Sequence, residues 1–388
     1  MRDIIGIICE YNPFHKGHKY QIDKIREKMP DAILIGIMSG NVVQRGEFSL
    51  FDRYKRAGFA AKSGLDGIFE IPYPYCGSTA EVFANAGVEI AQKLGCTYLC
   101  FGTENNDISE LEKIAEGVDC QKFNNDIKKI INDSTNYLEA KENALKNQGF
   151  SLPKSSNDIL ALEYIRAIKK KDIKLKYFSI KRIGAKYRDS SEQEIMSASA
   201  IREFFNKRKE ILSIPQNLEN DYVSTIKNGE YACSDKVNDF LFRFSILTSR
   251  DSFDNAFDSC SEIGAIIKNS AKLSKNSTQF FEKLNSKAYT TSRIKRILLY
   301  TLVGVKNVDK QPEFSILLYA NNQCKEILKN VRKNTDFIVI TKISDSKRLN
   351  AKSREQLDSL IRLNEIYYSF FEKPQSAKNA YDLKPIIK

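Results

Sequence analysis

The chain has 388 residues, 42% of them hydrophobic and 11% aromatic, so it is long enough and apolar enough for two packed domains. Its eight cysteines are scattered, no apolar run reaches membrane-spanning length and no signal-peptide pattern begins the sequence, which predicts a cytoplasmic protein without a membrane partner. These features exclude a small disulfide-stapled secreted domain and an integral membrane protein.

The formal net charge of +12 is distributed unevenly along the chain. Residues 1–203 carry 30 Lys and Arg against 28 Asp and Glu, whereas residues 204–388 carry 31 against 21. A basic half beside a neutral half is typical of a protein that holds a polyanion in one part and performs chemistry in the other. The alternative is a lysine-rich surface that reflects the composition of an AT-rich genome.

Apolar runs that alternate with helical patterns predict an α/β fold in the first half. The runs predict strands at residues 4–9, 32–38, 67–72, 98–101 and 175–180, and the intervening patterns predict helices at residues 18–29, 51–63 and 79–94. Such an alternation is typical of a parallel sheet with helices on both faces. We therefore expect a Rossmann-like catalytic domain over residues 1–205.

Residues 206–388 predict a second domain that is mainly helical and basic. Its basic segments include residues 207–209 and 290–296, and a small strand–helix–strand insertion is expected at residues 314–340. The tail after Glu372 is expected to be loosely ordered. This half is the candidate polyanion-binding domain.

The two histidines of the chain, His15 and His18, follow the first predicted strand at the start of a helix. A helix N-terminus offers unpaired N–H groups to a phosphate, and a spacing of three residues places both imidazoles on one face. Gly17, which has no side chain, would let a base or ribose approach the backbone. The pattern predicts stabilisation of charge on an α-phosphate. A chance pairing or half of a metal site is the alternative.

A second candidate phosphate site, residues 197–202, follows the last predicted strand. Ser199 and Arg202, with the N–H groups of a new helix, suit β- and γ-phosphates. An ordinary helix cap is the alternative. Because ligands bind beyond the carboxyl ends of parallel strands, we expect this segment to lie near His15, His18 and Gly102.

Several other charged residues are candidates for binding. A basic cluster after the second strand is expected either to contact phosphate or a nucleic acid or to form a solvated helix face, and it comprises Arg45, Arg53, Lys55 and Arg56. Arg293, Lys295 and Arg296 are candidates for contact with a nucleic-acid backbone. Glu104, at a strand end, is a candidate for positioning a ribose or a metal.

These motifs carry a family resemblance. The string Glu10-Tyr11-Asn12-Pro13-Phe14-His15-x-Gly17-His18, together with Ser197-x-Ser199-x-Ile201-Arg202, resembles the HxGH nucleotidyltransferases and, more narrowly, the bacterial tRNA(Met) cytidine acetate ligases. The resemblance continues in Ser39-Gly40-Asn41-x-x-Gln44-Arg45-Gly46-Glu47, Gly102-Thr103-Glu104, Ser156-Asn157-Asp158-Ile159-Leu160 and Lys181-Arg182-Ile183-Gly184.

The resemblance implies an activity with two steps. ATP, with Mg²⁺, activates acetate as acetyl-adenylate and releases pyrophosphate, and the acetyl group then passes to the wobble cytidine of elongator tRNA(Met). The implied catalytic residues are His15, His18, Ser199 and Arg202. The implied ATP site comprises Ile7, Ile8, Cys9, Glu10, Tyr11, Asn12, Pro13, Phe14, His15, Lys16, Gly17, His18, Lys19, Tyr20, Gly102, Asn157 and Arg182.

One departure from the family and two alternatives stay open. Relatives are expected to carry a histidine near Tyr187, where this chain has Arg188. One alternative is an adenylyltransferase for a small phosphorylated metabolite, although such an enzyme has no need of a large basic domain. The other is an RNA-binding protein on a degenerate nucleotide fold.

Overall fold

The computed structural model describes residues 2–104, 108–120, 123, 125–127, 137–183, 195–284 and 289–387. Arg188 lies outside the described residues. The strands are β1 Ile4–Cys9, β2 Ile33–Ser39, β3 Val42–Val43, β4 Glu47–Phe48, β5 Gly67–Ile71, β6 Tyr98–Thr103, β7 Lys176–Lys181, β8 Phe314–Ala320, β9 Ile338–Ile340 and β10 Ile386–Ile387.

The α-helices alternate with these strands in the first half and dominate the second. They are α1 Lys16–Lys28, α2 Arg53–Lys62, α3 Ala80–Lys93, α4 Ile108–Asp119, α6 Tyr137–Lys146, α7 Ser156–Lys170, α8 Ala198–Arg208, α9 Glu219–Lys227, α10 Ser234–Leu247, α11 Arg250–Asp254, α12 Ser261–Lys272, α13 Ser277–Leu284, α14 Thr291–Val303, α15 Cys324–Asn334 and α16 Ala351–Ser369. Short 3₁₀ helices are η1 Tyr75–Gly77, η2 Gln216–Leu218, η3 Ile343–Arg348 and η4 Ala377–Tyr381. No helix of the described residues combines the length and apolar character needed to cross a membrane.

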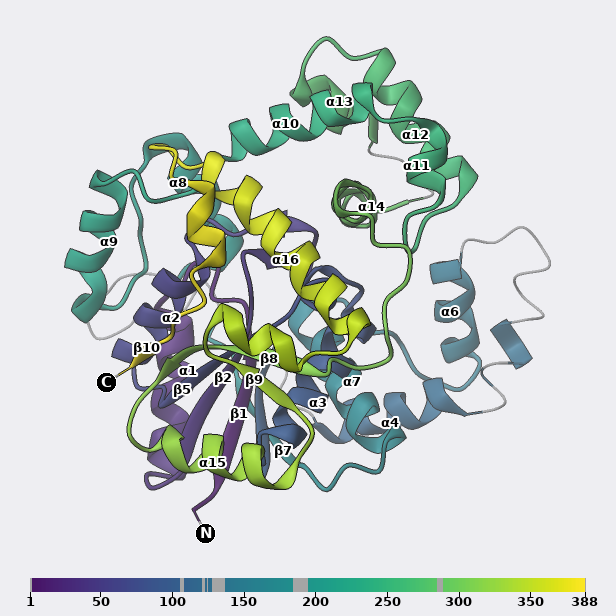
Figure 1. The fold of residues 1–388 in the computed structure, drawn as a ribbon. Helices are drawn as coiled ribbons and strands as arrows, with labels where there is room; N and C mark the ends of the chain where they lie inside the picture. Colours follow the sequence, from purple (N-terminus) through teal and green to yellow (C-terminus); the bar gives the residue numbers. More distant parts are fainter. Residues whose placement is uncertain are drawn as a thin grey trace.

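The central sheet has the strand order β10-β8-β5-β2-β1-β6-β7, and its strands β5, β2, β1, β6 and β7 run parallel. β2 lies inside the sheet (Figure 1). It is buried along its whole length, as expected for an apolar run in a parallel sheet. The chain moves from β1 to β2 on one side and later returns to β6 on the other side of β1. The strand order therefore reverses between β1 and β6, and the crevice at their carboxyl ends is the expected ligand position.

The second half of the chain completes the same sheet. β8 pairs antiparallel with β5, and β9 and β10 pair parallel with β8. The expected strand–helix–strand segment is thus present as β8, α15 and β9. The tail after Glu372 differs from the prediction, because it forms η4 and then β10 at the sheet edge. The boundary expected at residue 205 separates two stretches of sequence that share one sheet.

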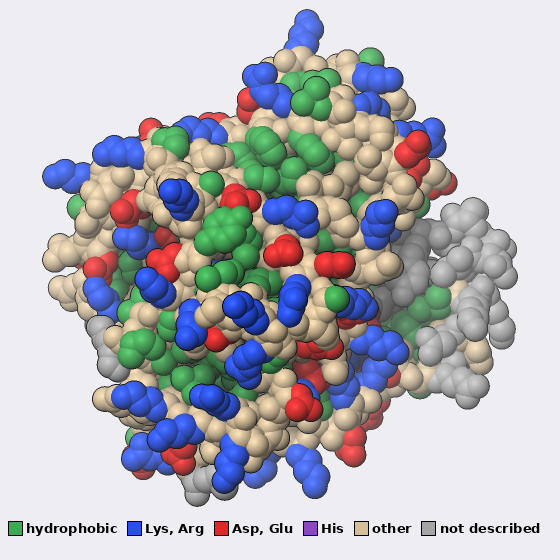
Figure 2. Space-filling view, viewed as in Figure 1, with side chains coloured by type: hydrophobic (Ala, Val, Ile, Leu, Met, Phe, Trp, Pro, Cys, Tyr) green, Lys and Arg blue, Asp and Glu red, His purple; other side chains and the backbone are tan. Residues whose placement is uncertain are grey.

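Five helices of the second half form a separate layer. Helices α10 to α14 gather away from the sheet, and α16 runs between them and the sheet (Figure 1). Contacts join α10 with α12 and α13, and α14 with α13 and α16. On the face shown in Figure 2, Lys and Arg side chains are spread widely and outnumber the acidic ones.

The turn after β2 contains a hairpin that the apolar pattern did not predict. β3 and β4 pair antiparallel around Gly46, which has a φ of +71°. A Cβ atom on Gly46 would lie 2.6 Å from the backbone nitrogen of Arg296 in α14. Glycine is required here both by the backbone conformation and by this close approach. The hairpin therefore joins the first half of the chain to α14.

Two arginines of the expected basic cluster are buried inside the fold. The Nη1 of Arg53 lies 2.8 Å from Oε2 of Glu70, and both side chains are at most 1% exposed. Arg56 donates to the backbone carbonyl oxygens of Phe51, Glu10, Ser39 and Gly40. The expectation of a phosphate contact or a solvated face is wrong for both residues. They hold together the loops that follow β1 and β2.

Candidate active site

A cavity of about 470 Å³ lies at the carboxyl ends of β1 and β6. It is bounded by the turn after β1, the β3–β4 hairpin and the first turns of α7 and α8. The expected site residues that line it are Ile8, Cys9, Glu10, Tyr11, Asn12, His15, His18, Gly102, Asn157, Arg182, Ser199 and Arg202. The structure thus brings both candidate phosphate segments and the strand-end residues to one place.

Seven residues of the expected ATP segment do not line this cavity: Ile7, Pro13, Phe14, Lys16, Gly17, Lys19 and Tyr20. Three of them make contacts that support the turn or α1. Ile7 is buried within β1, and the carbonyl of Phe14 accepts a hydrogen bond from the hydroxyl of Tyr222 at 2.7 Å. Lys19 pairs with Asp23 along α1. Ile7, Phe14 and Lys19 therefore help to hold the turn and the start of α1 in place.

His15 and His18 form a reciprocal cap at the start of α1. The Nδ1 of His15 accepts from the backbone N–H of Gly17 at 3.0 Å, and the Nδ1 of His18 accepts from the backbone N–H of His15 at 3.2 Å. The two rings are stacked with centroids 3.8 Å apart. Because each Nδ1 accepts a hydrogen bond, a neutral ring carries its proton on Nε2. The cap therefore leaves two Nε2–H donors at the cavity.

Burial keeps both rings neutral. It lowers the pKa of His15 to about 3, and the nearby positive charge of Arg182 acts in the same direction. Burial also lowers the pKa of His18, with further contributions from His15 and Arg182. Neutral imidazoles donate hydrogen bonds to an anion without bringing a second full charge beside Arg182. Preorganised neutral donors of this kind can bind a phosphate.

The depressed pKa of His15 predicts a loss of stability in mild acid. The ordinary pKa of 6.5 applies to the unfolded chain, so between pH 6.5 and the folded value of about 3 only the unfolded state gains this proton. On acidification from about pH 6.5 to pH 5, proton binding by His15 in the unfolded state should therefore lower the free energy of unfolding by about 2 kcal/mol. Urea unfolding of the wild type and of His15→Asn, which keeps a capping acceptor, measures this difference. Equal losses in both proteins would contradict the assignment.

Gly17 has a role different from the one expected. A Cβ atom there would lie 2.8 Å from Cε1 and 3.1 Å from Nδ1 of His15. The space above Gly17 is thus occupied by the imidazole of His15, and not held open for a base or a ribose. Glycine at this position allows the histidine to cap the helix.

Gly17→Ala is therefore expected to displace the His15 ring and weaken ATP binding by at least about tenfold. The matched control is Gly58→Ala in α2, where a Cβ atom meets only Ile386 at 3.9 Å. That change should leave ATP binding unaltered and raise the unfolding free energy by about 0.5–1 kcal/mol. Calorimetric titration with ATP and urea unfolding test both outcomes. Unchanged ATP affinity in Gly17→Ala would show that the position of the His15 ring does not affect ATP binding.

Glu104 organises the far wall of the cavity. Its Oε1 accepts from Nε of Arg182 and from Nδ2 of Asn157, each at 3.0 Å. Its backbone N–H donates to Asp158 at 2.9 Å. The side chain of Arg182 crosses Gly102, where a Cβ atom would lie 3.0 Å from Cγ of the arginine. Glu104 thus positions the residues expected at the ATP site.

The α8 segment closes the opposite side. Ser197 caps α8, and its hydroxyl lies 3.1 Å from that of Ser199. Arg202 donates to the carbonyl of Asn12 at 2.7 Å. Glu47 lies between Arg202 and Lys295, at 3.9 Å and 2.7 Å respectively. An arginine from α8 and a lysine from α14 therefore meet one carboxylate at the cavity edge.

The sequence motifs did not assign every side chain in the site. Gln44 and Glu47 come from the hairpin, and Phe83 and Tyr164 come from α3 and α7. The spacing of apolar residues gave no reason to separate Phe83 and Tyr164 from ordinary core positions. Arg45 belonged to the expected basic cluster, and it lines the cavity and donates to Ser156 at 2.6 Å.

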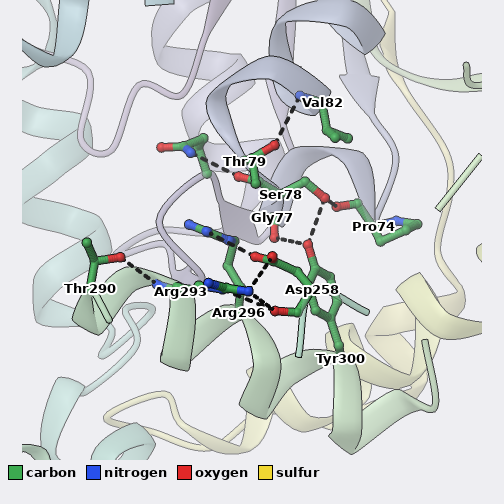
Figure 3. A network of polar contacts seen from close by, with 11 residues as sticks. Pro74, Gly77, Ser78, Thr79, Val82, Asp258, Thr290, Arg293, Arg296 and Tyr300 are labelled. Carbon is green, nitrogen blue, oxygen red and sulfur yellow. Dashed lines mark hydrogen bonds and ion pairs between the residues drawn. The ribbon is translucent and has the colours of Figure 1, made fainter. Parts of the chain in front are cut away.

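The α14 arginines lie in a polar network beside the site (Figure 3). Arg293 donates to the carbonyl of Asp258 at 2.8 Å, and Arg296 lies 3.7 Å from the Asp258 carboxylate. Tyr300 of the same helix bonds Ser78 and the carbonyl of Gly77. The network fixes α14 against the segment that precedes α3.

The donor set of the described residues contains no group of three or more His, Cys, Asp or Glu side chains arranged to hold a metal ion. Glu104, a candidate metal position, is already engaged by Arg182 and Asn157.

The chain is similar to known proteins over nearly its full length. A sequence model of the HIGH nucleotidyl transferase family matches residues 2–382. The tRNA(Met) cytidine acetate ligase of Ligilactobacillus salivarius is 34% identical over 394 residues, covering 97% of this chain and 98% of that protein. That of Caldicellulosiruptor bescii is 30% identical over 384 residues, covering 95% of each. Thermotoga maritima TmcAL, in a crystal structure with alpha-thio ATP bound, has a TM-score of 0.89 and 25% identity and covers 99% of both chains. The chain therefore belongs to the HIGH nucleotidyl transferases and, within them, to the family of the tRNA(Met) cytidine acetate ligases.

Proposed function

We propose that this protein uses ATP to activate acetate as acetyl-adenylate and transfers the acetyl group to the wobble cytidine of elongator tRNA(Met). Pyrophosphate is released in the first step and AMP in the second. The observation that carries the proposal is the pair of neutral imidazoles in a chain that matches tRNA(Met) cytidine acetate ligases over nearly its full length.

In the first step the His15 and His18 Nε2–H groups donate to the α-phosphate while an acetate oxygen attacks phosphorus. The donors are fixed by the cap before ATP arrives, so their reorganisation costs little as charge develops. Arg182, anchored by Glu104, supplies a further positive charge beside the rings. These three groups act on the reacting phosphate.

Ser199 and Arg202 bind the leaving pyrophosphate at the other side of the cavity. The hydroxyl and the guanidinium lie on the first turns of α8, which adds its N-terminal N–H groups to the same anion. Mg²⁺ would be held by the phosphates with water, and when bound it neutralises part of their charge. The protein supplies position and donors.

In the second step the cytidine must leave the anticodon stack to bring its exocyclic amine into the cavity. The second half of the chain, with 31 Lys and Arg against 21 Asp and Glu, is the partner for the tRNA phosphates. α14 approaches both the hairpin and the cavity edge through Lys295. Lys295 thus pairs with a residue that lines the cavity, which supports an approach of tRNA from the basic half toward the site.

The test is incubation with labelled acetate, ATP, Mg²⁺ and elongator tRNA(Met), followed by mass spectrometry of the nucleosides. N4-acetylcytidine, together with free AMP and pyrophosphate, is the expected result. A metabolite adenylyltransferase would retain AMP in its product, and a protein that only binds RNA would consume no ATP. Unmodified cytidine in the presence of consumed ATP would refute the transfer step.

A further inference from the structure

We propose that the Glu10 carboxylate is the catalytic base that accepts the proton lost by the cytidine amine during acetyl transfer. This inference rests on the proposed function and concerns its second step. Glu10 follows directly after β1 and lines the cavity between the histidine cap and the hairpin.

The reaction requires such a group. The N4 lone pair attacks the carbonyl carbon of acetyl-adenylate, a C–N bond forms, and the C–O bond to the adenylate phosphate breaks so that AMP leaves with the electron pair. The nitrogen then carries one proton too many and must release it. Because the amine lone pair of cytosine is delocalised into the ring, removal of this proton during attack assists the reaction.

The other titratable groups lining the cavity in the described chain are unsuited to take that proton. Each histidine already carries a proton on Nε2, and its Nδ1 accepts a hydrogen bond from a backbone N–H. Burial raises the pKa values of Cys9, Tyr11 and Tyr164, which keeps these groups protonated. Glu10 and Glu47 are the two carboxylates that remain.

Glu47 is a weak base because two cations hold it. Although burial acts in the opposite direction, Lys295 and Arg202 lower the pKa of Glu47 below its usual range. Glu10 differs, because burial raises its pKa and outweighs the positive charges nearby. A carboxylate with a raised pKa is the better proton acceptor near neutral pH.

A relay of hydrogen bonds fixes Glu10 in place. Its Oε1 accepts from the backbone N–H of Gln44 at 2.8 Å, and the Gln44 side chain donates to the carbonyl of Ser78 at 2.9 Å. The Ser78 hydroxyl lies 2.8 Å from that of Tyr300 on α14 (Figure 3). Among the described residues no other hydrogen bond is made to this carboxylate, so Oε2 is available to substrate. The relay thus links Glu10 to α14, in the basic half of the chain.

Groups from several elements set the charge of Glu10. Arg56 of α2 and Arg202 of α8 favour its ionised form, and Glu47 of β4 opposes it. The titratable neighbours without charge are Cys9, Cys76 and Tyr164. The rate of acetyl transfer should therefore fall in acid as Glu10 becomes protonated, and a variant without the carboxylate should lose this dependence.

Glu10→Gln tests the proposal because the amide oxygen still accepts from Gln44. Acetate-dependent exchange of labelled pyrophosphate into ATP reports the first step, and single-turnover acetylation of tRNA reports the second. Because Glu10 also belongs to the expected ATP site, exchange should fall as well, and we expect transfer to fall at least about 30-fold more than exchange, with bound acetyl-adenylate accumulating. Glu10→Asp should recover part of the transfer rate and its acid dependence. Glu116→Gln, an exposed carboxylate on α4, is the control and should match the wild type in both steps.

The outcomes are distinct. Equal losses of exchange and transfer in Glu10→Gln would assign Glu10 to ATP binding and overturn the proposal, as would transfer at the wild-type rate. A Glu10→Gln protein that does not fold leaves the decision to Glu10→Asp and to the pH profile of wild-type transfer, where a rate independent of pH in acid overturns it. Absence of both steps in the wild type would instead refute the proposed function itself.

Discussion

Replacing His18 with asparagine is expected to slow acetate-dependent pyrophosphate exchange by about 10²- to 10³-fold while the fold is kept. The asparagine oxygen takes the place of Nδ1 and still accepts from the backbone N–H of His15. The change therefore removes one donor from the α-phosphate without removing the cap. Exchange of labelled pyrophosphate into ATP measures the loss, and circular dichroism with urea unfolding shows whether the fold is intact.

The companion variant His18→Gln separates the donor from the cap. A glutamine amide nitrogen reaches the position of Nε2, so it should recover part of the exchange activity even though the bond to His15 is lost. If His18→Asn were fully active, or if His18→Gln were no better than His18→Asn, electrostatic stabilisation by Nε2–H would be refuted. Both variants leave His15 as the chain's single histidine.

Arg53→Met is expected to lower the free energy of unfolding by about 3–5 kcal/mol. The change removes the cation from a fully buried pair and leaves the Glu70 carboxylate in the core without its partner. The same core holds the loops after β1 and β2, so ATP binding should weaken together with stability. Urea unfolding followed by fluorescence, with calorimetric titration of ATP, measures both effects.

The double variant Arg53→Met/Glu70→Leu tests the reason for that loss. With both charges replaced by apolar groups, much of the stability should return, because the uncompensated carboxylate is gone. A double variant as unstable as the single one would show that the loss of stability comes from packing around Arg53 and not from the buried charge. Lys62→Met is the control, since its pair with Asp221 is exposed and should change stability by less than about 1 kcal/mol.

The sequence predicted the parallel part of the sheet well because its strands are short segments rich in apolar residues, and β1 and β2 are almost entirely apolar. β1, β2, β5 and β6 lie within two residues of their expected positions, and their carboxyl ends meet as the alternation requires. The β3–β4 hairpin was missed because each strand has two residues, too few for any period. The pairing of β8 with β5 was missed because hydrophobic periodicity does not specify a partner distant in sequence.

The candidate site was predicted in part for a similar reason. His15 and His18 stand out as the chain's two histidines, and their position after a strand indicated a helix start. Their mutual cap, which explains Gly17, depends on side-chain rotamers that spacing does not encode. Arg53 and Arg56 were misassigned because charged residues are usually exposed, and their partners Glu70 and the loop carbonyls become visible when the chain is folded.

The pairing of β5 with β8 also has a consequence for synthesis. β5 ends at Ile71 and its partner begins at Phe314, so the ribosome makes most of the protein before that ladder can close. Until then the nascent sheet presents an unpaired edge, and such edges are sites of aggregation. The long separation also gives a high contact order and slow folding. The nucleotide-binding sheet is therefore completed late, when most of the basic half has already been synthesised.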